Sequence, residues 1–180
     1  MKNNIFINNN KTPKLVDYMG DTTNGRENLG AEMPVFVYRL FQYSLKQHLN
    51  EEFGKDKSIE IFRRAGYISG QFFSSSFLDL NADFKNFVSQ LQKKLEEFKI
   101  GILRIEDYDE NNGRLVLTVS EDVDCSGLPV LGETVCNYDE GFISGILSSY
   151  TKQNYEAIEI DCWATGDRVC RFDAKIKDKT

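Results

Sequence analysis

The chain has little of several residue types, and each shortage narrows what the protein is expected to be. Its 180 residues include one histidine and three prolines, and no apolar run approaches the length of a membrane span. The first ten residues lack the continuous apolar core of a signal peptide. Acidic residues outnumber basic ones by 28 to 22, and the net charge of −6 opposes sequence-independent binding to nucleic-acid phosphates or anionic lipids. We therefore expect a cytoplasmic protein with no membrane span and no nucleic-acid partner.

Two further shortages bear on catalysis. The chain has no Gly-x-Gly-x-x-Gly motif after a strand and no phosphate-binding loop, so nothing marks a site for a nucleotide or hydride donor. His48 is the sole histidine, and a lone histidine near a helix end is more typical of packing or capping than of ligand binding, because its proton and metal roles need partners. The sequence thus favours a non-catalytic protein over an enzyme.

The residues that are present predict one globular domain. Hydrophobic residues make up 41% of the chain and aromatic residues 12%, which is ordinary for a folded protein. A chain of this length buries about two-thirds of its unfolded surface, so it needs neither a disulfide nor a metal to form a core. Any metal site would serve local order or function.

Hydrophobic periodicity gives the expected order of elements. Apolar residues at helical spacing predict helices over about 35–53, 61–77, 84–98 and 139–150. Alternation and turn residues predict strand pairs at 101–108 with 114–121 and at 154–162 with 168–176, the first pair joined through Asn112-Gly113. Helices, a hairpin, another helix and another hairpin indicate an α+β fold.

Two of the predicted helices share a short pattern of glycines. Residues 66–70 read Gly-Tyr-Ile-Ser-Gly and residues 141–145 read Gly-Phe-Ile-Ser-Gly. Because glycine lowers helix stability, a pair one turn apart suggests a close approach of another backbone or of a ligand. We expect the two helices to cross at these glycines, the alternative being that both line one cavity.

The cysteines are concentrated near the end of the chain. The first 124 residues contain none, and three of the four lie between Cys136 and Cys170. Thiolates suit zinc, and a structural zinc site needs four ligands. Cys136, Cys162 and Cys170 provide three, and the fourth candidates are Glu159, Cys125 and, more distantly, Asp161. Regular strand alternation opposes Glu159 as a partner of Cys162 unless the strand bulges, and buried free cysteines acting as small apolar residues are the alternative to a metal site.

A family resemblance is carried by this same region. The run from Gly132 to Gly145 with the segment 159–172, including Cys162-Trp-Ala-Thr-Gly-Asp-Arg-Val-Cys170-Arg-Phe, resembles the 4-vinyl reductase domain family. The resemblance extends from about Arg26 onward, which implies a single domain over 26–180 preceded by a polar segment, 1–25. It also implies helices packed on an antiparallel sheet, as in the small subunits of TRAPP vesicle-tethering complexes, and usually a homodimer with an apolar cavity.

The resemblance also implies a ligand set. In the similar sensor domain of phenol-responsive activators, three cysteines and one glutamate hold zinc at the spacing shown here by Cys136, Glu159, Cys162 and Cys170. This implication favours Glu159 over Cys125 as the fourth ligand. Those sensors also have a tryptophan and a histidine in their aromatic pocket, whereas Trp163 lies beside the metal ligands and His48 lies far upstream, so phenol itself is not the expected ligand.

The function we expect from these features is that of a stand-alone zinc-containing domain that senses or carries a small hydrophobic molecule, of tetrapyrrole or aromatic type. Aromatic and aliphatic residues of two helices are the candidate cavity lining, although apolar sites and cores use the same residue types: Phe72, Phe73, Phe77, Phe142 and Ile146. The alternatives are a non-catalytic dimeric interaction scaffold or accessory subunit and, less favoured, a vinyl reductase. Fold analogy alone is a weak basis for the scaffold.

Overall fold

The computed structural model describes residues 12–177 and divides the chain into two compact units, residues 1–32 and 33–180. The first unit holds two short helices, α1 (Leu15–Met19) and α2 (Thr22–Gly25), the second of which is capped by the Asp21 side chain. The polar segment expected at 1–25 falls in this unit, and its first eleven residues lie outside the described part of the chain.

The second unit combines helices with one sheet, and this confirms the α+β fold. Its elements follow the predicted order closely: α3 (Val35–Phe53), α4 (Lys55–Phe77), α5 (Phe84–Glu97), β1 (Ile102–Asp109), β2 (Arg114–Ser120), α6 (Asn137–Thr151), β3 (Tyr155–Asp161), a 3-10 turn (Trp163–Thr165) and β4 (Cys170–Ile176). No helix among the described residues combines the length and apolar character needed to cross a membrane.

The sheet has the strand order β1-β2-β4-β3, and every neighbouring pair is antiparallel. The predicted turn at Asn112-Gly113 joins β1 to β2, and Gly113 has a positive φ of 59°, a conformation that favours glycine. Buried residues alternate along β3 and β4, so one face of these strands packs against helices. The sheet thereby holds β3 and β4 side by side near their cysteines.

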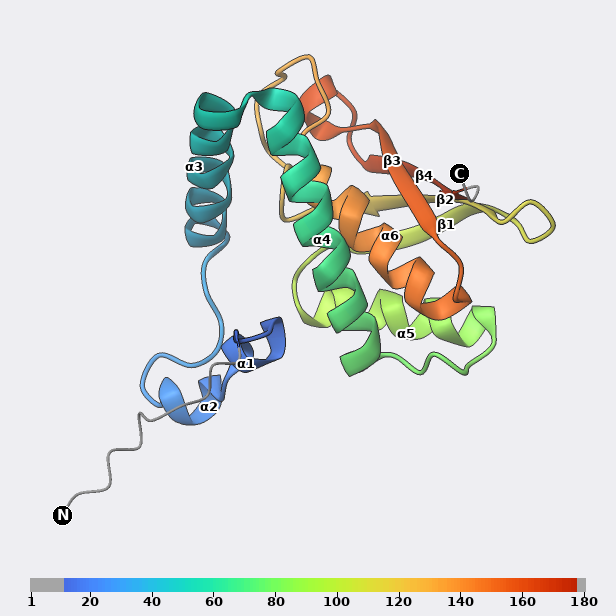
Figure 1. Ribbon diagram of the computed structural model, residues 1–180, viewed down its shortest axis with the longest axis horizontal. Helices are drawn as coiled ribbons and strands as arrows, with labels where there is room; N and C mark the ends of the chain where they lie inside the picture. The colour runs from blue at the N-terminus through green and yellow to red at the C-terminus, as the bar shows by residue number, and fades with distance from the viewer. Residues whose placement is uncertain (1–11, 178–180) are drawn as a thin grey trace. The chain divides into compact units, whose positions relative to one another are not determined.

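Helices α5 and α6 lie against the sheet, and α4 packs on α6 (Figure 1). Phe87 on α5 and Phe172 on β4 are completely buried in the core between these layers. The helix-breaking conformation of Gly54, with φ of 80°, ends α3 and immediately precedes α4. Helix α5 is capped by Asp83, whose side chain accepts a hydrogen bond from the Asn86 N–H, and not by Asp79 or Asn81 as the sequence suggested.

The glycine pairs lie where α4 and α6 cross, as predicted. A Cβ atom added at Gly66 would overlap the Tyr138 carbonyl oxygen, and one added at Gly141 would overlap the Arg63 carbonyl oxygen. Gly70 and Gly145 meet opposing backbone in the same way. The two helices are therefore in backbone contact, and only glycine permits this separation.

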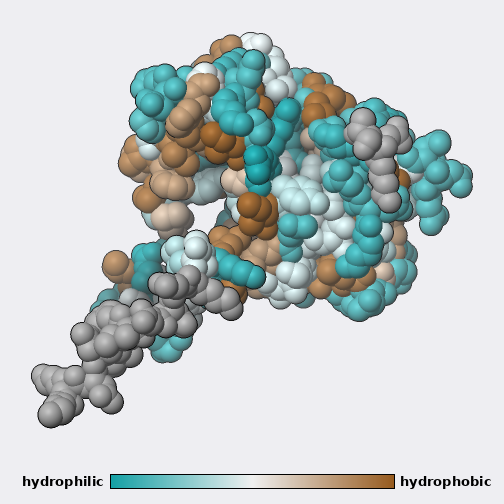
Figure 2. Space-filling view, viewed as in Figure 1, coloured by the Kyte–Doolittle hydropathy of each residue, from teal (hydrophilic) through white to brown (hydrophobic). Residues whose placement is uncertain are grey.

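The apolar stripe of α3 behaves differently from the prediction. Phe41 is 68% exposed and Leu40 58% exposed, although helical periodicity made them candidates for a buried face. Figure 2 shows apolar residues gathered over this helix. Periodicity identifies an apolar face, but it does not say whether the same chain covers that face.

A candidate metal centre and an adjoining cavity

Four cysteine sulfur atoms meet at the end of the sheet. The Sγ atoms of Cys125, Cys136, Cys162 and Cys170 all lie within 4.8 Å of one another, and all four residues are buried. Cys136 immediately precedes α6, Cys162 follows β3, Cys170 begins β4, and Cys125 lies in the loop between β2 and α6. Segments far apart in the sequence thus converge on one point.

The distances between these sulfur atoms fit a tetrahedral metal site. Cys136 Sγ lies 3.8 Å from Cys162 Sγ and 3.7 Å from Cys170 Sγ. Zinc–sulfur bonds of about 2.3 Å in a tetrahedron place the sulfurs about 3.8 Å apart. The Cys125–Cys170 distance of 3.0 Å is shorter than that edge but far longer than the ~2.0 Å of a disulfide. The donor set therefore fits zinc after a small adjustment.

Glu159 lies directly beside this cluster. Its Oε2 accepts a hydrogen bond from the Cys136 N–H at 3.0 Å, and its Oε1 is buried with no hydrogen-bond partner. Burial, followed by the negative charge of Cys162, raises the pKa of Glu159 to about 8. The strand objection is resolved, because the β3–β4 register shifts between Glu159 and Asp161, which is the irregularity that the sequence required.

The thiols interact strongly with one another. Hydrogen bonds from the neighbouring thiols, first of all Cys125, lower the pKa of Cys162, whereas the same contacts raise the pKa of Cys136. Proton loss is thus directed to Cys162, whose N–H is hydrogen-bonded to Thr165 Oγ1 in the 3-10 turn. A metal ion binding here would replace the remaining thiol protons.

A second buried polar group, the aspartates Asp122, Asp124 and Asp139, adjoins the sulfurs. Carboxylate oxygens of Asp122 and Asp139 lie within 4.8 Å of each other and of Cys136 Sγ. Burial and the neighbouring Asp124 raise the pKa of Asp122 to about 7, and burial raises the pKa of Asp139 well above its ordinary value. The sequence analysis missed this group; its signal was Asp139, one turn after Cys136 and one turn before Phe142.

Asp124 is held by side chains of α3. It is completely buried and accepts hydrogen bonds of 2.6 Å from Tyr38 Oη and from Gln42 Nε2. Its pKa is raised by burial, and these two hydrogen bonds oppose the shift. Lys46 on the same helix donates to the Val135 carbonyl oxygen and to Asn137 Oδ1. Helix α3 therefore anchors the loop that carries Cys125 and Cys136.

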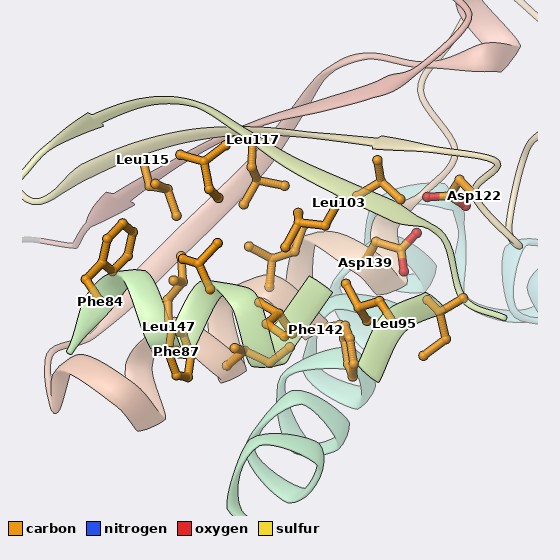
Figure 3. Close-up of a pocket in the computed structure, with 17 residues that line it drawn as sticks. Phe84, Phe87, Leu95, Leu103, Leu115, Leu117, Asp122, Asp139, Phe142 and Leu147 are labelled. Atoms are coloured by element: carbon orange, nitrogen blue, oxygen red, sulfur yellow. The ribbon is translucent and has the colours of Figure 1, made fainter. Parts of the chain in front are cut away.

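An apolar cavity extends from the aspartates between α5, the sheet and α6. It has a volume of about 40 Å³, room for a few water molecules. Figure 3 shows Asp122 and Asp139 at one end of the cavity, near Leu95, and Phe84 at the other end. Apart from the two aspartates its lining is entirely apolar.

The predicted ligand-binding residues lie in two places. Phe142 and Ile146 line the cavity from α6. Phe73 packs edge-on against Phe142 with ring centroids 5.2 Å apart, Phe77 is 40% exposed beside Phe98, and Phe72 is half-buried on α4. The structure brings Phe142 and Ile146 together at the cavity and places the three α4 residues around or outside the core next to it.

Two residues singled out from the sequence lie apart from the sulfur ligands. Trp163 is half-buried with the Arg168 guanidinium 4.8 Å from its ring centroid, a cation–π contact. His48 is exposed on α3. Neither touches the cavity lining.

The fold and this site together define an α+β domain with a buried four-cysteine candidate metal centre beside an apolar cavity. Residues 115–176 match the model of the 4-vinyl reductase (4VR) domain. This match covers β2 through β4 with all four cysteines, and it confirms the family resemblance seen in the sequence. The chain therefore contains a 4-vinyl reductase domain.

Similar proteins agree with this assignment. An uncharacterized protein of Methanocaldococcus jannaschii is 28% identical over 152 residues, 84% of this chain and 83% of that protein. A crystal structure of a vinyl-4-reductase family protein from the same organism superposes with a TM-score of 0.62 at 16% identity, over 95% of this chain and 100% of that one.

Two other solved structures share the fold. The phenol-responsive sensory domain of the transcription activator PoxR, solved with phenol, has a TM-score of 0.58 at 15% identity, over 82% of this chain and 78% of that one. A trafficking protein particle complex subunit 3 from Naegleria fowleri, covalently bound to palmitic acid, has a TM-score of 0.61 at 16% identity, over 80% and 95%. At these identities the similarity establishes the fold alone.

Proposed function

We propose that this protein is a zinc-containing ligand-binding domain that senses or carries a small hydrophobic molecule. The observation that carries this proposal is the position of the cavity, whose polar end lies within 4.8 Å of the Cys136 sulfur. The structural likeness to a phenol-responsive sensory domain is consistent with it. A cavity of about 40 Å³ favours a slim ligand over a tetrapyrrole, since binding must then open the packing only slightly.

Cys136, Cys162 and Cys170 are the proposed core of the zinc site. The geometry favours Cys125 as the fourth ligand, because its sulfur belongs to the cluster, and leaves Glu159 as the acceptor of the Cys136 N–H. Zinc held by four protein ligands is typical of a structural site, whereas a catalytic zinc keeps a position open for water. This favours binding over a reductase activity.

Helix α6 provides the physical link between ligand and metal. Cys136 precedes its first turn, and Phe142 and Ile146 line the cavity from its middle. A displacement of α6 on ligand binding would therefore move a metal ligand, and the sheet end that carries Cys162 and Cys170 would respond. We propose this coupling as the means by which occupancy is reported.

Native mass spectrometry of the untagged protein, purified without chelators, tests the function. We expect one zinc ion per chain together with a small apolar molecule. Zinc on an otherwise empty protein that also takes up no added apolar molecule would contradict ligand binding and favour a scaffold. Absence of metal would contradict the zinc site.

A dimeric scaffold is the second candidate, and one observation favours it. Helix α3 exposes Phe36, Leu40 and Phe41, each more than half exposed, as a continuous apolar face. A patch of this kind is typical of a protein interface, and we propose a second copy of the chain as its partner. We also propose that residues 26–180 form the functional domain and that the protein is cytoplasmic, where its four cysteines stay reduced.

A further inference from the structure

The cavity is elongated, and its length follows one helix. The residues that α5 contributes recur at helical spacing from one end of the cavity to the other: Phe84, Phe87, Val88, Leu91 and Leu95. Eleven residue steps along a helix span about 16 Å at 1.5 Å each. An extended apolar chain lying along α5 matches this shape better than a broad ring system does.

The polar end of the cavity offers hydrogen-bond acceptors without matching donors. Asp122 is 4% exposed, and its Oδ1 accepts one hydrogen bond, of 2.7 Å, from the Asp124 N–H. Asp139 lies opposite it in the first turn of α6. Among the described residues no lysine or arginine forms an ion pair with either carboxyl group, and the nearby Lys46 is bonded to Val135 and Asn137.

Two carboxyl groups at the end of an apolar cavity are costly unless a donor reaches them. The completely buried Asp124 is satisfied by Tyr38 and Gln42, whereas Asp122 and Asp139 line the cavity itself. A hydroxyl or amine on the ligand would supply the missing donors. A carboxylate on the ligand would instead add a like charge in a poorly solvated place.

We propose that the cavity takes a slim amphiphile, with an unbranched apolar chain along α5 and a hydrogen-bond-donating head, a hydroxyl or an amine, at Asp122 and Asp139. This inference rests on the proposed ligand-binding function and specifies its ligand class. It also separates this protein from carriers of fatty acids, because the same chain with a carboxylate head is rejected.

The head group has a route to this position from outside. Asp122 also borders a surface cleft whose other walls include Lys99, Trp163 and Arg168. Asp122 is thus shared between the cleft and the apolar cavity. A ligand that arrives in the cleft meets the carboxyl group first and then inserts its chain along α5.

The test compares three probes with one chain length: 1-hexanol, hexylamine and hexanoate, titrated into the zinc-loaded protein by isothermal calorimetry. We expect hexanol, hexylamine or both to bind at least about tenfold more tightly than hexanoate, since a donor to a buried carboxyl replaces a like-charge contact. A preference limited to hexylamine assigns a cationic head, and one shared with hexanol assigns a neutral donor.

Variants locate the binding and its selectivity. Asp139→Asn should reduce the ratio of hexylamine to hexanoate affinity toward one while zinc content is unchanged. Val88→Phe, which fills the cavity, should abolish binding of all three probes, and Phe41→Ser, on the exposed α3 face, should change none. Should Asp139→Asn fail to fold, the ranking of the probes on the unaltered protein still decides.

The outcomes separate the two proposals. Hexanoate binding as tightly as the other probes, in a manner sensitive to Val88→Phe, would overturn the head-group inference and leave ligand binding intact. Absence of binding for every probe would overturn both. Binding that Val88→Phe does not affect would place the probes outside the cavity and also overturn the inference.

Discussion

Cys125 and Glu159 compete for one role, and a pair of substitutions distinguishes them. Cys125→Ser removes a sulfur that lies within 4.8 Å of the other three, so we expect loss of bound zinc and a lower melting temperature. Glu159→Gln keeps an oxygen that can accept the Cys136 N–H, so we expect zinc to be retained. Zinc content measured with a chromogenic chelator after unfolding checks both. Retention in Cys125→Ser with loss in Glu159→Gln would identify Glu159 as the ligand.

Single residues were predictable from the sequence where the chemistry was local. The spacing of Cys136, Cys162 and Cys170 identified three converging sulfurs, and the opposed faces of Glu159 and Cys162 predicted a bulge that the structure contains. The place of Cys125 was left open, because it depends on the path of a long loop tied down by Tyr38 and Gln42 through Asp124. No local pattern encodes such a path.

The crossing of α4 and α6 makes the strongest prediction about an element. Gly145→Ala puts a Cβ atom against the Tyr67 carbonyl oxygen, which is backbone and cannot rotate away. We expect the free energy of unfolding to fall by roughly 2 kcal/mol or more, at the upper part of the range for overpacking. Gly25→Ala is the control, because its Cβ meets nothing within 4 Å. Denaturant unfolding measures both, and an unchanged midpoint for Gly145→Ala would contradict the backbone contact.

One ion pair ties three elements together beside the metal centre. Glu140 on α6 is 1% exposed and accepts hydrogen bonds from Arg63 Nε on α4 at 2.5 Å and from the Glu159 N–H on β3 at 3.0 Å. Arg63→Ala leaves the buried carboxylate without its cation, so we expect a loss of about 3 kcal/mol in the free energy of unfolding. Lys57→Ala, in an exposed pair with Glu60, should cost less than about 0.5 kcal/mol. Equal costs in denaturant unfolding would refute this role.

Elements were predicted well wherever periodicity was long, and less well at their ends. The apolar stripe from Phe84 to Leu95 gave α5 its type and extent, but its cap, Asp83, competes in the sequence with Asp79 and Asn81, each able to accept a backbone hydrogen bond. The short helices α1 and α2 carry no periodic signal, because a single helical turn is too short to show one.

At the scale of the whole molecule, the metal centre joins the loop before α6 to the ends of β3 and β4. Removal of zinc would leave four buried thiols to be satisfied by each other alone. We expect removal of zinc with a high-affinity chelator to lower the melting temperature by several degrees and re-addition of zinc to restore it, since metal binding energy contributes directly to folding. Differential scanning fluorimetry checks this, and an unaltered melting temperature at full zinc removal would show that the site does not support the fold.

The exposed face of α3 makes the final prediction, which concerns assembly. Phe36, Leu40 and Phe41 are apolar, adjacent along the helix and exposed, while the polar side of the same helix, with Tyr38 and Gln42, faces the loop at Asp124. A helix that uses its polar side within the chain has its apolar side free for a partner, and a second copy presents the same face. We expect a dimer by light scattering and a monomer for Phe41→Glu, with zinc content unchanged; Lys57→Ala, on the neighbouring helix, should remain dimeric. A monomeric unaltered protein at high micromolar concentration would instead require a different partner for this face, and would remove the second copy from the proposal.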